Sequence, residues 1–136
     1  MEDCKHVNSP LNHKEKLSKD DGADVVNETH YRSLTSCLMY LTTTRPYILY
    51  VVSVLSTFMH CPCEEHLKAA KRVVRYIKRT INYEIKFQKS QNLLLVGYSN
   101  NDWGGSLDDR KSALGYCFSL GLGIFSWCSK KQETIA

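Results

Sequence analysis

The spacing of apolar residues changes once along this chain, and that change limits the folds that the chain can adopt. From Thr29 to about residue 80, apolar side chains recur at intervals of three and four, as in Leu34, Leu38 and Leu41, which is the spacing of a helix with one buried face. Beyond residue 83 the interval is two, as in Val96 and Tyr98, which is the period of a half-buried strand. The sequence therefore predicts an α+β fold in which helices come first and strands second.

Three helices are predicted in the first part of the chain. The first runs from Thr29 to about residue 41, and Asn27 or Thr29 caps its start. The second begins at Pro46, because proline suits the first turn of a helix, and extends to His60. The third spans residues 64–80, where an acidic start and a basic end both match the helix dipole.

Strands are predicted in the second part of the chain. Ile85 and Phe87 indicate a short strand, and longer strands follow over residues 93–98, 113–120 and 123–128. Glycine and aspartate residues, which favour turns, separate the last three. We expect these strands to pair in chain order as an antiparallel meander.

Residues 1–28 combine charged side chains with Pro10 and Gly22 and lack apolar spacing, so we expect an extended or disordered N-terminal segment. A helical region over residues 29–82 and a strand region over 83–136 follow. The polar N-terminus has no signal-peptide pattern, and no apolar run is long enough to span a membrane. The sequence therefore predicts an intracellular protein, cytoplasmic or nuclear, with reduced cysteines and no membrane partner.

Basic residues are concentrated on one face of the third predicted helix. Six of the 18 Lys and Arg residues in the chain lie there, opposite the apolar stripe: Lys68, Lys71, Arg72, Arg75, Lys78 and Arg79. Such a row can contact the phosphates of a nucleic acid, and Tyr76 and Tyr83 lie within reach. The simpler alternative is a solvated helix face, which needs no ligand.

The strand predicted at residues 93–98 ends in a cluster of side-chain oxygens. Asn100, Asn101 and Asp102 follow the strand, and Asp108 and Asp109 lie in the next turn. Hard cations such as Mg²⁺ prefer carboxylates, whereas two of the first three side chains are neutral amides. We therefore interpret the turn as a solvated hairpin tip, with no metal site and no bound cofactor.

Four further side chains have atoms that can bind zinc: His60, Cys61, Cys63 and His66. Structural zinc sites usually pair cysteines two to four residues apart with a second, distant pair of ligands. Here a single proline separates the two cysteines, which is too short for a good chelate. We therefore interpret this segment as a loop with free thiols.

Several short motifs follow one another in a fixed order along nearly the whole chain. They are Tyr31–Leu34, Leu38–Leu41, Thr44–Pro46, Ala70–Arg72, Arg75–Lys78, Gly97–Gly105, Asp109–Ser112, Gly115–Tyr116 and Ser126–Gln132. This series resembles the Pol polyprotein of Ty1/copia-type LTR retrotransposons, especially plant copies. Several motifs in the right order make the resemblance more specific than any one motif.

The resemblance implies that the chain contains the end of the reverse transcriptase, its helical connection over residues 29–82, and the start of the RNase H domain over 83–136. Residues 93–100 would form the first strand of an RNase H-like fold, followed by the strands at 113–120 and 123–128. We then expect a truncated domain, with Met1 as an internal methionine of a longer reading frame.

The chain departs from this family at the catalytic positions. The family pattern at the end of the first RNase H strand resembles Tyr-Ser-Asp-x-Asp-Trp, whose first Asp is a metal ligand. Asn100 occupies that position, whereas Asp102 retains the second acidic residue. The other RNase H carboxylates would lie beyond Ala136, and the polymerase aspartates before Met1. The resemblance thus implies that the chain alone lacks the Mg²⁺ site of the intact family and is not an enzyme.

An intact RNase H-like domain also has a further strand and helices that cover the meander. Without them, Phe118, Phe125 and Trp127 are expected to be partly exposed. We therefore predict marginal stability or dependence on a partner.

Our first hypothesis is a degenerate, inactive polyprotein fragment with residual affinity for an RNA–DNA duplex or DNA, through the six basic residues of the third helix. Two alternatives remain. One is an RNase H that another Pol-derived chain completes, although Asn100 argues against it. The other is a domesticated protein–protein interaction module whose open sheet edge accepts a strand from a partner.

Overall fold

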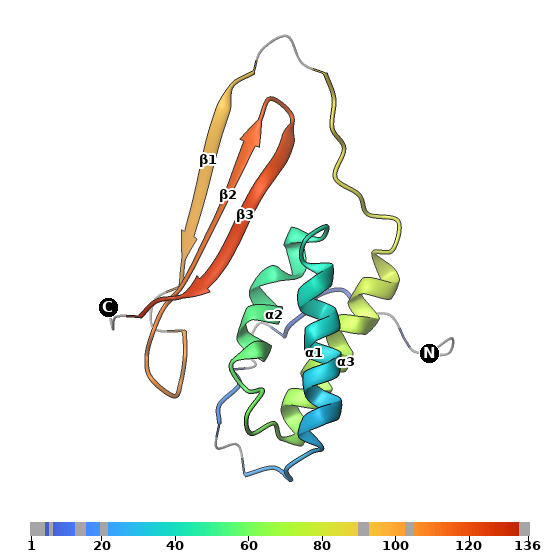
Figure 1. The fold of residues 1–136 in the computed structure, drawn as a ribbon, viewed down its shortest axis with the longest axis vertical. Helices are drawn as coiled ribbons and strands as arrows, with labels where there is room; N and C mark the ends of the chain where they lie inside the picture. The colour runs from blue at the N-terminus through green and yellow to red at the C-terminus, as the bar shows by residue number, and fades with distance from the viewer. Residues whose placement is uncertain are drawn as a thin grey trace. The chain divides into compact units, whose positions relative to one another are not determined.

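A computed structural model describes residues 5, 7–12, 16–19, 22–89, 93–102 and 105–133. The chain divides into two compact units, residues 1–83 and residues 84–136. Within the described residues, the first unit contains three α-helices and the second contains a three-stranded antiparallel sheet (Figure 1). The predicted α+β order is therefore confirmed.

The first helix, α1 (Glu28–Leu41), begins one residue before the predicted start at Thr29. The side chain of Asn27 accepts a hydrogen bond from the backbone N–H of His30 at 2.9 Å, so Asn27 is the cap. The hydroxyl group of Tyr31 on α1 donates to the carbonyl oxygen of Leu55 at 2.9 Å. Tyr31 is fully buried, and this burial raises the pKa of its hydroxyl group.

The second helix is shorter than predicted. A single 3-10 turn, η1 (Pro46–Ile48), precedes α2 (Leu49–Ser56), and the helix ends four residues before His60. The hydroxyl groups of Ser53, Ser56 and Thr57 each donate to the carbonyl oxygen three residues earlier. These bonds compete with helical backbone bonds and bring the last turn of α2 to a close.

The third helix, α3 (Glu64–Arg79), matches its prediction to within one residue. Its cap is Cys63, whose backbone N–H donates to Nδ1 of His66 at 3.0 Å, while the backbone of His66 bonds to the Cys63 side chain. This reciprocal arrangement is a capping box with an unusual pair of residues.

The helical unit encloses one hydrophobic core. Its buried members come from all three α-helices, from η1 and from two flanking loops: Leu17, Tyr31, Leu38, Ile48, Val51, Val52, Leu55, Phe58, Ala69, Ala70 and Val73.

The described parts of the N-terminal segment are extended and lie against the helices. Val25 forms an antiparallel bridge with Cys63, and the backbone N–H of Val26 donates to the carbonyl oxygen of Pro62 at 3.0 Å. Leu17 is buried in the core of the helical unit. This segment is therefore part of the helical unit.

The strand unit consists of β1 (Leu95–Asn101), β2 (Ala113–Leu120) and β3 (Gly123–Lys131). The strands pair in the order β1-β2-β3, with Gly97 opposite Phe118 in the first ladder. β1 begins two residues later than predicted and β3 ends three residues later. Gly121, in the turn between β2 and β3, has a φ of +60°, a left-handed conformation that glycine adopts without strain.

The short strand predicted at Ile85 and Phe87 is wrong, because residues 83–89 have no strand structure. The Phe87 ring instead lies against Gly123, where an added Cβ atom would approach its Cδ1 atom to 2.9 Å. The aromatic residue that suggested strand alternation thus packs against the β2–β3 hairpin.

Apolar side chains on the sheet remain partly exposed, as predicted. Phe118 is 38% exposed and Phe125 is 52% exposed, while Trp127 is half-buried. One face of β2 presents a continuous row of exposed large side chains: Leu114, Tyr116, Phe118 and Leu120.

Candidate nucleic-acid interface

The six predicted basic residues lie on the outer face of α3, because the opposite face of this helix carries Ala69, Ala70 and Val73 into the core. In the structure, two of the six, Lys68 and Arg72, are already engaged by other groups of the chain.

Lys68, near the start of α3, is already paired. Its Nζ atom lies 2.7 Å from Oε1 of Glu65 and 3.6 Å from Oε2 of Glu64. The hydrogen bond to Glu65 raises the pKa of Lys68, so the amine keeps its proton but its field is offset by two carboxylates. This residue contributes less to a phosphate site than the sequence suggests.

Arg72 is held by the N-terminal segment. Its Nε atom donates to the carbonyl oxygen of Ser9 at 3.1 Å, and a terminal nitrogen donates to the Ser9 hydroxyl oxygen at 3.2 Å. Both bonds use the fork of donors that a phosphate would otherwise accept. Sequence reasoning missed Ser9, since 63 residues separate it from Arg72 and no local pattern connects them.

The other four basic residues lie over residues 71–79, toward the C-terminal end of the helix. Lys71 and Arg79 are exposed, whereas Arg75 and Lys78 are half-buried. Within the described structure, Nε of Arg75 is buried and has no hydrogen-bond partner. The sequence from His66 to Tyr83 contains no Asp or Glu. Positive charge is therefore concentrated and unopposed by sequence neighbours at this end of α3.

Three tyrosines gather beside this basic end. The ring of Tyr47, in η1, lies edge-on to the ring of Tyr76 with centroids 5.9 Å apart, and to the ring of Tyr83 at 6.4 Å. Burial raises the pKa of Tyr76. Sequence analysis named Tyr76 and Tyr83 but missed Tyr47, which only the packing of η1 against α3 brings to them.

The Cys and His side chains near α3 serve the fold. Since Nδ1 of His66 accepts from the Cys63 backbone, Nε2 carries the proton and donates to the carbonyl oxygen of Ser18 at 2.9 Å. The His66 ring is fully buried and stacks on Phe58 at 4.0 Å. His60 instead contacts Arg32, with Nδ1 3.2 Å from a guanidinium nitrogen. Among the residues that the structure describes, no three His, Cys, Asp or Glu side chains are placed to hold a metal ion.

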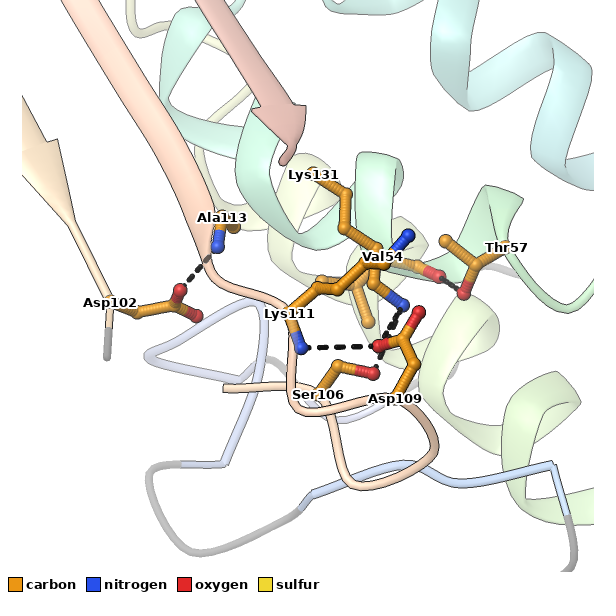
Figure 2. A network of polar contacts seen from close by, with 8 residues as sticks. All are labelled: Val54, Thr57, Asp102, Ser106, Asp109, Lys111, Ala113 and Lys131. Atoms are coloured by element: carbon orange, nitrogen blue, oxygen red, sulfur yellow. Dashed lines mark hydrogen bonds and ion pairs between the residues drawn. The ribbon is translucent and has the colours of Figure 1, made fainter. Parts of the chain in front are cut away.

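The carboxylate of Asp102, just after β1, is used within the strand unit (Figure 2). A carboxylate oxygen of Asp102 accepts a hydrogen bond from the backbone N–H of Ala113, at the start of β2. A Cβ atom on Gly105 would overlap this carboxylate, so the backbone at Gly105 packs closely on it. Asp102 therefore fastens the two strands together.

Asp109 is also engaged within the loop between β1 and β2. Its Oδ1 atom lies 2.8 Å from Nζ of Lys131 and accepts from the backbone N–H of Lys111 at 3.3 Å (Figure 2). The hydrogen bond from Lys131 lowers the pKa of Asp109 to about 2. Lys131 also donates to the hydroxyl oxygen of Ser106 at 3.0 Å.

These residues do not fit the Mg²⁺ site that the family resemblance implies. Asn100 supplies a neutral amide, and it lies opposite Gly115 in the ladder. The Asp102 carboxylate bonds to the Ala113 backbone, and Asp109 is paired with Lys131. A divalent cation would have to displace these partners and would still gain few charged ligands.

No helix within the described residues is both long enough and apolar enough to cross a membrane.

Comparison with known proteins reveals clear relatives. The chain is 44% identical to the retrovirus-related Pol polyprotein from transposon RE1 of Arabidopsis thaliana, over 97% of this chain and 9% of that protein. It is 39% identical to the corresponding protein from transposon RE2 of the same plant, over 97% of this chain and 9% of that protein. The chain thus spans about a tenth of the length of these polyproteins.

A third relative is of similar size. The secreted RxLR effector protein 161 of Plasmopara viticola is 45% identical over 78% of this chain and 75% of that protein. No family model matches the chain, and no solved structure matches it. The order of motifs, the confirmed α+β architecture and the near-complete coverage of this chain agree, and the chain belongs to the family of Pol polyproteins of Ty1/copia-type retrotransposons.

Proposed function

We propose that this chain is a non-catalytic part of a retrotransposon Pol polyprotein that binds an RNA–DNA hybrid or DNA duplex through residues 71–79 of α3. The observation that carries the proposal is the group of four basic residues there, Lys71, Arg75, Lys78 and Arg79, with no acidic residue among them. Duplex nucleic acid attracts such a surface through its phosphates, without regard to base sequence.

The helix places these charges at useful intervals. Lys71, Arg75 and Arg79 are each four residues apart, so they form one row with a rise of about 6 Å per step. Such a row can follow a phosphate backbone. Relative to the six residues predicted from sequence, the proposal gives less weight to Lys68 and Arg72, because carboxylates and Ser9 already occupy them.

The test is a matched pair of charge-reversal variants. The double variant Lys71→Glu/Arg79→Glu changes two exposed residues of the row, and Lys16→Glu/Lys86→Glu changes net charge equally at exposed positions elsewhere. Binding to a labelled RNA–DNA hybrid is measured by fluorescence anisotropy at several salt concentrations. We expect the first variant to weaken binding at least about tenfold and to reduce the salt slope by about two.

The control variant should retain most of the affinity and nearly the same salt slope. Equal losses of affinity in both variants would show that the duplex is attracted by the net charge of the chain and that the basic face of α3 has no special role. That result would contradict the proposed interface.

Absence of catalysis is the second part of the proposal. It is supported by Asn100 and by the internal bonds of Asp102 and Asp109. We expect no cleavage of the hybrid by the purified chain in Mg²⁺ or Mn²⁺, and none by the Asn100→Asp variant, since one restored carboxylate does not make a two-metal site. Metal-dependent cleavage by the wild-type chain would overturn this part and favour the RNase H alternative.

A second candidate function is protein–protein interaction. Within the described residues β1 and β3 each pair with β2 alone, and the apolar row of β2 is exposed. The order β1-β2-β3 supports the proposal that this sheet corresponds to the first three strands of an RNase H-like fold. A Pol-derived chain that supplies further strands or helices is the partner that this surface favours. Protection of β1 or β3 amides from hydrogen exchange on mixing with such a chain would support this function, and unchanged exchange would exclude it.

A further inference from the structure

We infer that the three tyrosines beside the end of α3 form a stacking platform for unpaired bases, so that this surface takes single-stranded nucleic acid next to a duplex. Tyr47, Tyr76 and Tyr83 are hereafter called the tyrosine platform. The inference deepens the proposed function and rests on it for the phosphate contacts, which the same α3 residues supply.

The geometry of the platform is defined by three segments of the helical unit. Tyr47 lies edge-on to both other rings, with interplanar angles of 75° to Tyr76 and 70° to Tyr83. Edge-to-face contacts of this kind are a favoured arrangement of aromatic rings and hold the three together. Tyr83 is 62% exposed, so one ring of the platform is open to a ligand.

The backbone after α3 determines where Tyr83 lies. The buried Thr80 ends the helix, and its hydroxyl group donates to the carbonyl oxygen of Tyr76 at 3.0 Å. The backbone N–H of Tyr83 then donates to the carbonyl oxygen of Thr80 at 2.9 Å. This turn brings an exposed aromatic ring back to the helix end instead of leaving it in an extended linker.

Positively charged side chains of α3 lie near the rings of the tyrosine platform. Arg79 lies close enough to Tyr76 to act on the ionisation of its hydroxyl group, and Arg75 and Lys78 are on the same turn of the helix. A phosphate oxygen is the acceptor that a guanidinium group binds most strongly, through two parallel N–H bonds.

Aromatic rings beside basic side chains are typical of proteins that bind single strands. Bases stack on the rings, and the phosphates between them contact Lys and Arg. In the interior of a duplex, each base is already stacked on its neighbours and cannot reach a tyrosine ring. The platform therefore fits unpaired nucleotides of RNA or DNA, with little preference for sequence.

The experiment compares the wild-type chain with two variants at Tyr83. Tyr83→Ala removes the exposed ring, and Tyr83→Phe keeps it while removing the hydroxyl group. Anisotropy titrations use labelled dT and U single strands of 12 nucleotides and a blunt 12-base-pair RNA–DNA hybrid. We expect Tyr83→Ala to weaken single-strand binding about five- to tenfold and to change hybrid binding less than twofold, while Tyr83→Phe binds like the wild type. The dT and U strands distinguish DNA from RNA as the preferred ligand.

A second measurement does not depend on affinity. A single strand containing 4-thiouridine is cross-linked to the wild-type chain by light, and the modified peptide is identified by mass spectrometry. An adduct on the peptide that contains Tyr47, Tyr76 or Tyr83 supports the platform. Adducts found only in the strand unit overturn it.

The two hypotheses can fail separately. If the hybrid binds through Lys71 and Arg79 but Tyr83→Ala leaves single-strand binding unchanged, the platform is refuted and the proposed function stands. If single-strand binding depends on the Tyr83 ring but the hybrid does not bind, the duplex proposal is refuted and the platform stands. If the wild-type chain binds neither ligand, both are refuted.

Discussion

In the helical unit, apolar side chains from several segments converge on one core, whereas in the strand unit every apolar side chain that the structure describes remains at least partly exposed. The two units therefore differ in the interactions that hold their secondary structure in place. Helices are held by burial of side chains such as Leu55 and Val73. The sheet is held by its backbone ladders and by the bonds of Asp102 and Asp109.

This difference matters because burial contributes most of the stability of a small domain. A fully buried Leu or Val side chain contributes about 1.5–3 kcal/mol relative to an exposed one. A three-stranded sheet with no buried face has few such contributions and needs a covering surface for independent stability. We therefore expect the helical unit to fold by itself and the strand unit to be the less stable of the two. The candidate nucleic-acid interface lies entirely on the more stable unit.

The largest expected effect tests this comparison directly. Leu55→Ala leaves a cavity in the helical core and should cost about 2–5 kcal/mol of unfolding free energy. Leu114→Ala, on the exposed face of β2, should cost less than about 1 kcal/mol.

Far-ultraviolet circular dichroism reports mainly the helices. Tryptophan fluorescence reports the strand unit, which contains both tryptophans. Coincident shifts of both signals in Leu55→Ala would show that the two units unfold together.

The next effect concerns a buried polar residue of the helical unit. His66→Ala removes the bonds to the Cys63 backbone and to Ser18, together with the ring stacked on Phe58. Leaving these groups without partners should cost about 2–4 kcal/mol in urea unfolding. His60→Ala is the control, because this residue contacts Arg32 at the surface, and it should cost less than about 1 kcal/mol. Equal losses would contradict the structural role assigned to His66.

A smaller effect tests how the N-terminal segment is attached. Arg72→Ala removes both bonds to Ser9 and should cost about 1 kcal/mol. Trypsin should then cleave faster after Lys16 and Lys19, as measured by mass spectrometry over time. Lys71→Ala removes a neighbouring exposed positive charge and should leave the cleavage rate unchanged. Faster cleavage in both variants would mean that charge, and not the Ser9 contact, holds the segment.

The smallest expected effect lies in the strand unit and depends on pH. The pKa of Asp109 is lowered to about 2 from its ordinary 3.8, so its pairing with Lys131 stabilises the folded chain above pH 3.8. That contribution is lost as the pH falls through about 2. Because the pair is partly exposed, it should not exceed about 1 kcal/mol.

Lys131→Met should therefore flatten the loss of stability between pH 4 and pH 2, as followed by tryptophan fluorescence. The control is Lys130→Met, whose partner Glu133 is strongly exposed. An identical pH profile for Lys131→Met and the wild type would show that the ion pair contributes nothing in solution.

Much of the architecture followed from local patterns. Apolar spacing predicted the three helices and the three long strands, and Asn27 and Pro46 marked helix starts for reasons that involve only their own side chains. The prediction at Ile85 and Phe87 failed because two alternating apolar residues are too few to distinguish a strand from an aromatic ring packed on a distant glycine. The second helix ended early because serine and threonine hydroxyl groups compete for its carbonyl oxygens.

The sequence by itself determined the order of elements, the basic face of α3 and the replacement of a family carboxylate by Asn100, since each depends on residue type and spacing. Only the tertiary structure decided that Arg72 is already bonded and that a third tyrosine joins the site, because the contacts of Arg72 with Ser9 and of Tyr47 with Tyr76 join segments that are far apart in the chain. The tertiary structure also determined that His66 supports the core and that Asp102 connects β1 to β2. Spacing along a chain fixes which face a side chain occupies, whereas its partner depends on what the rest of the fold brings to that face.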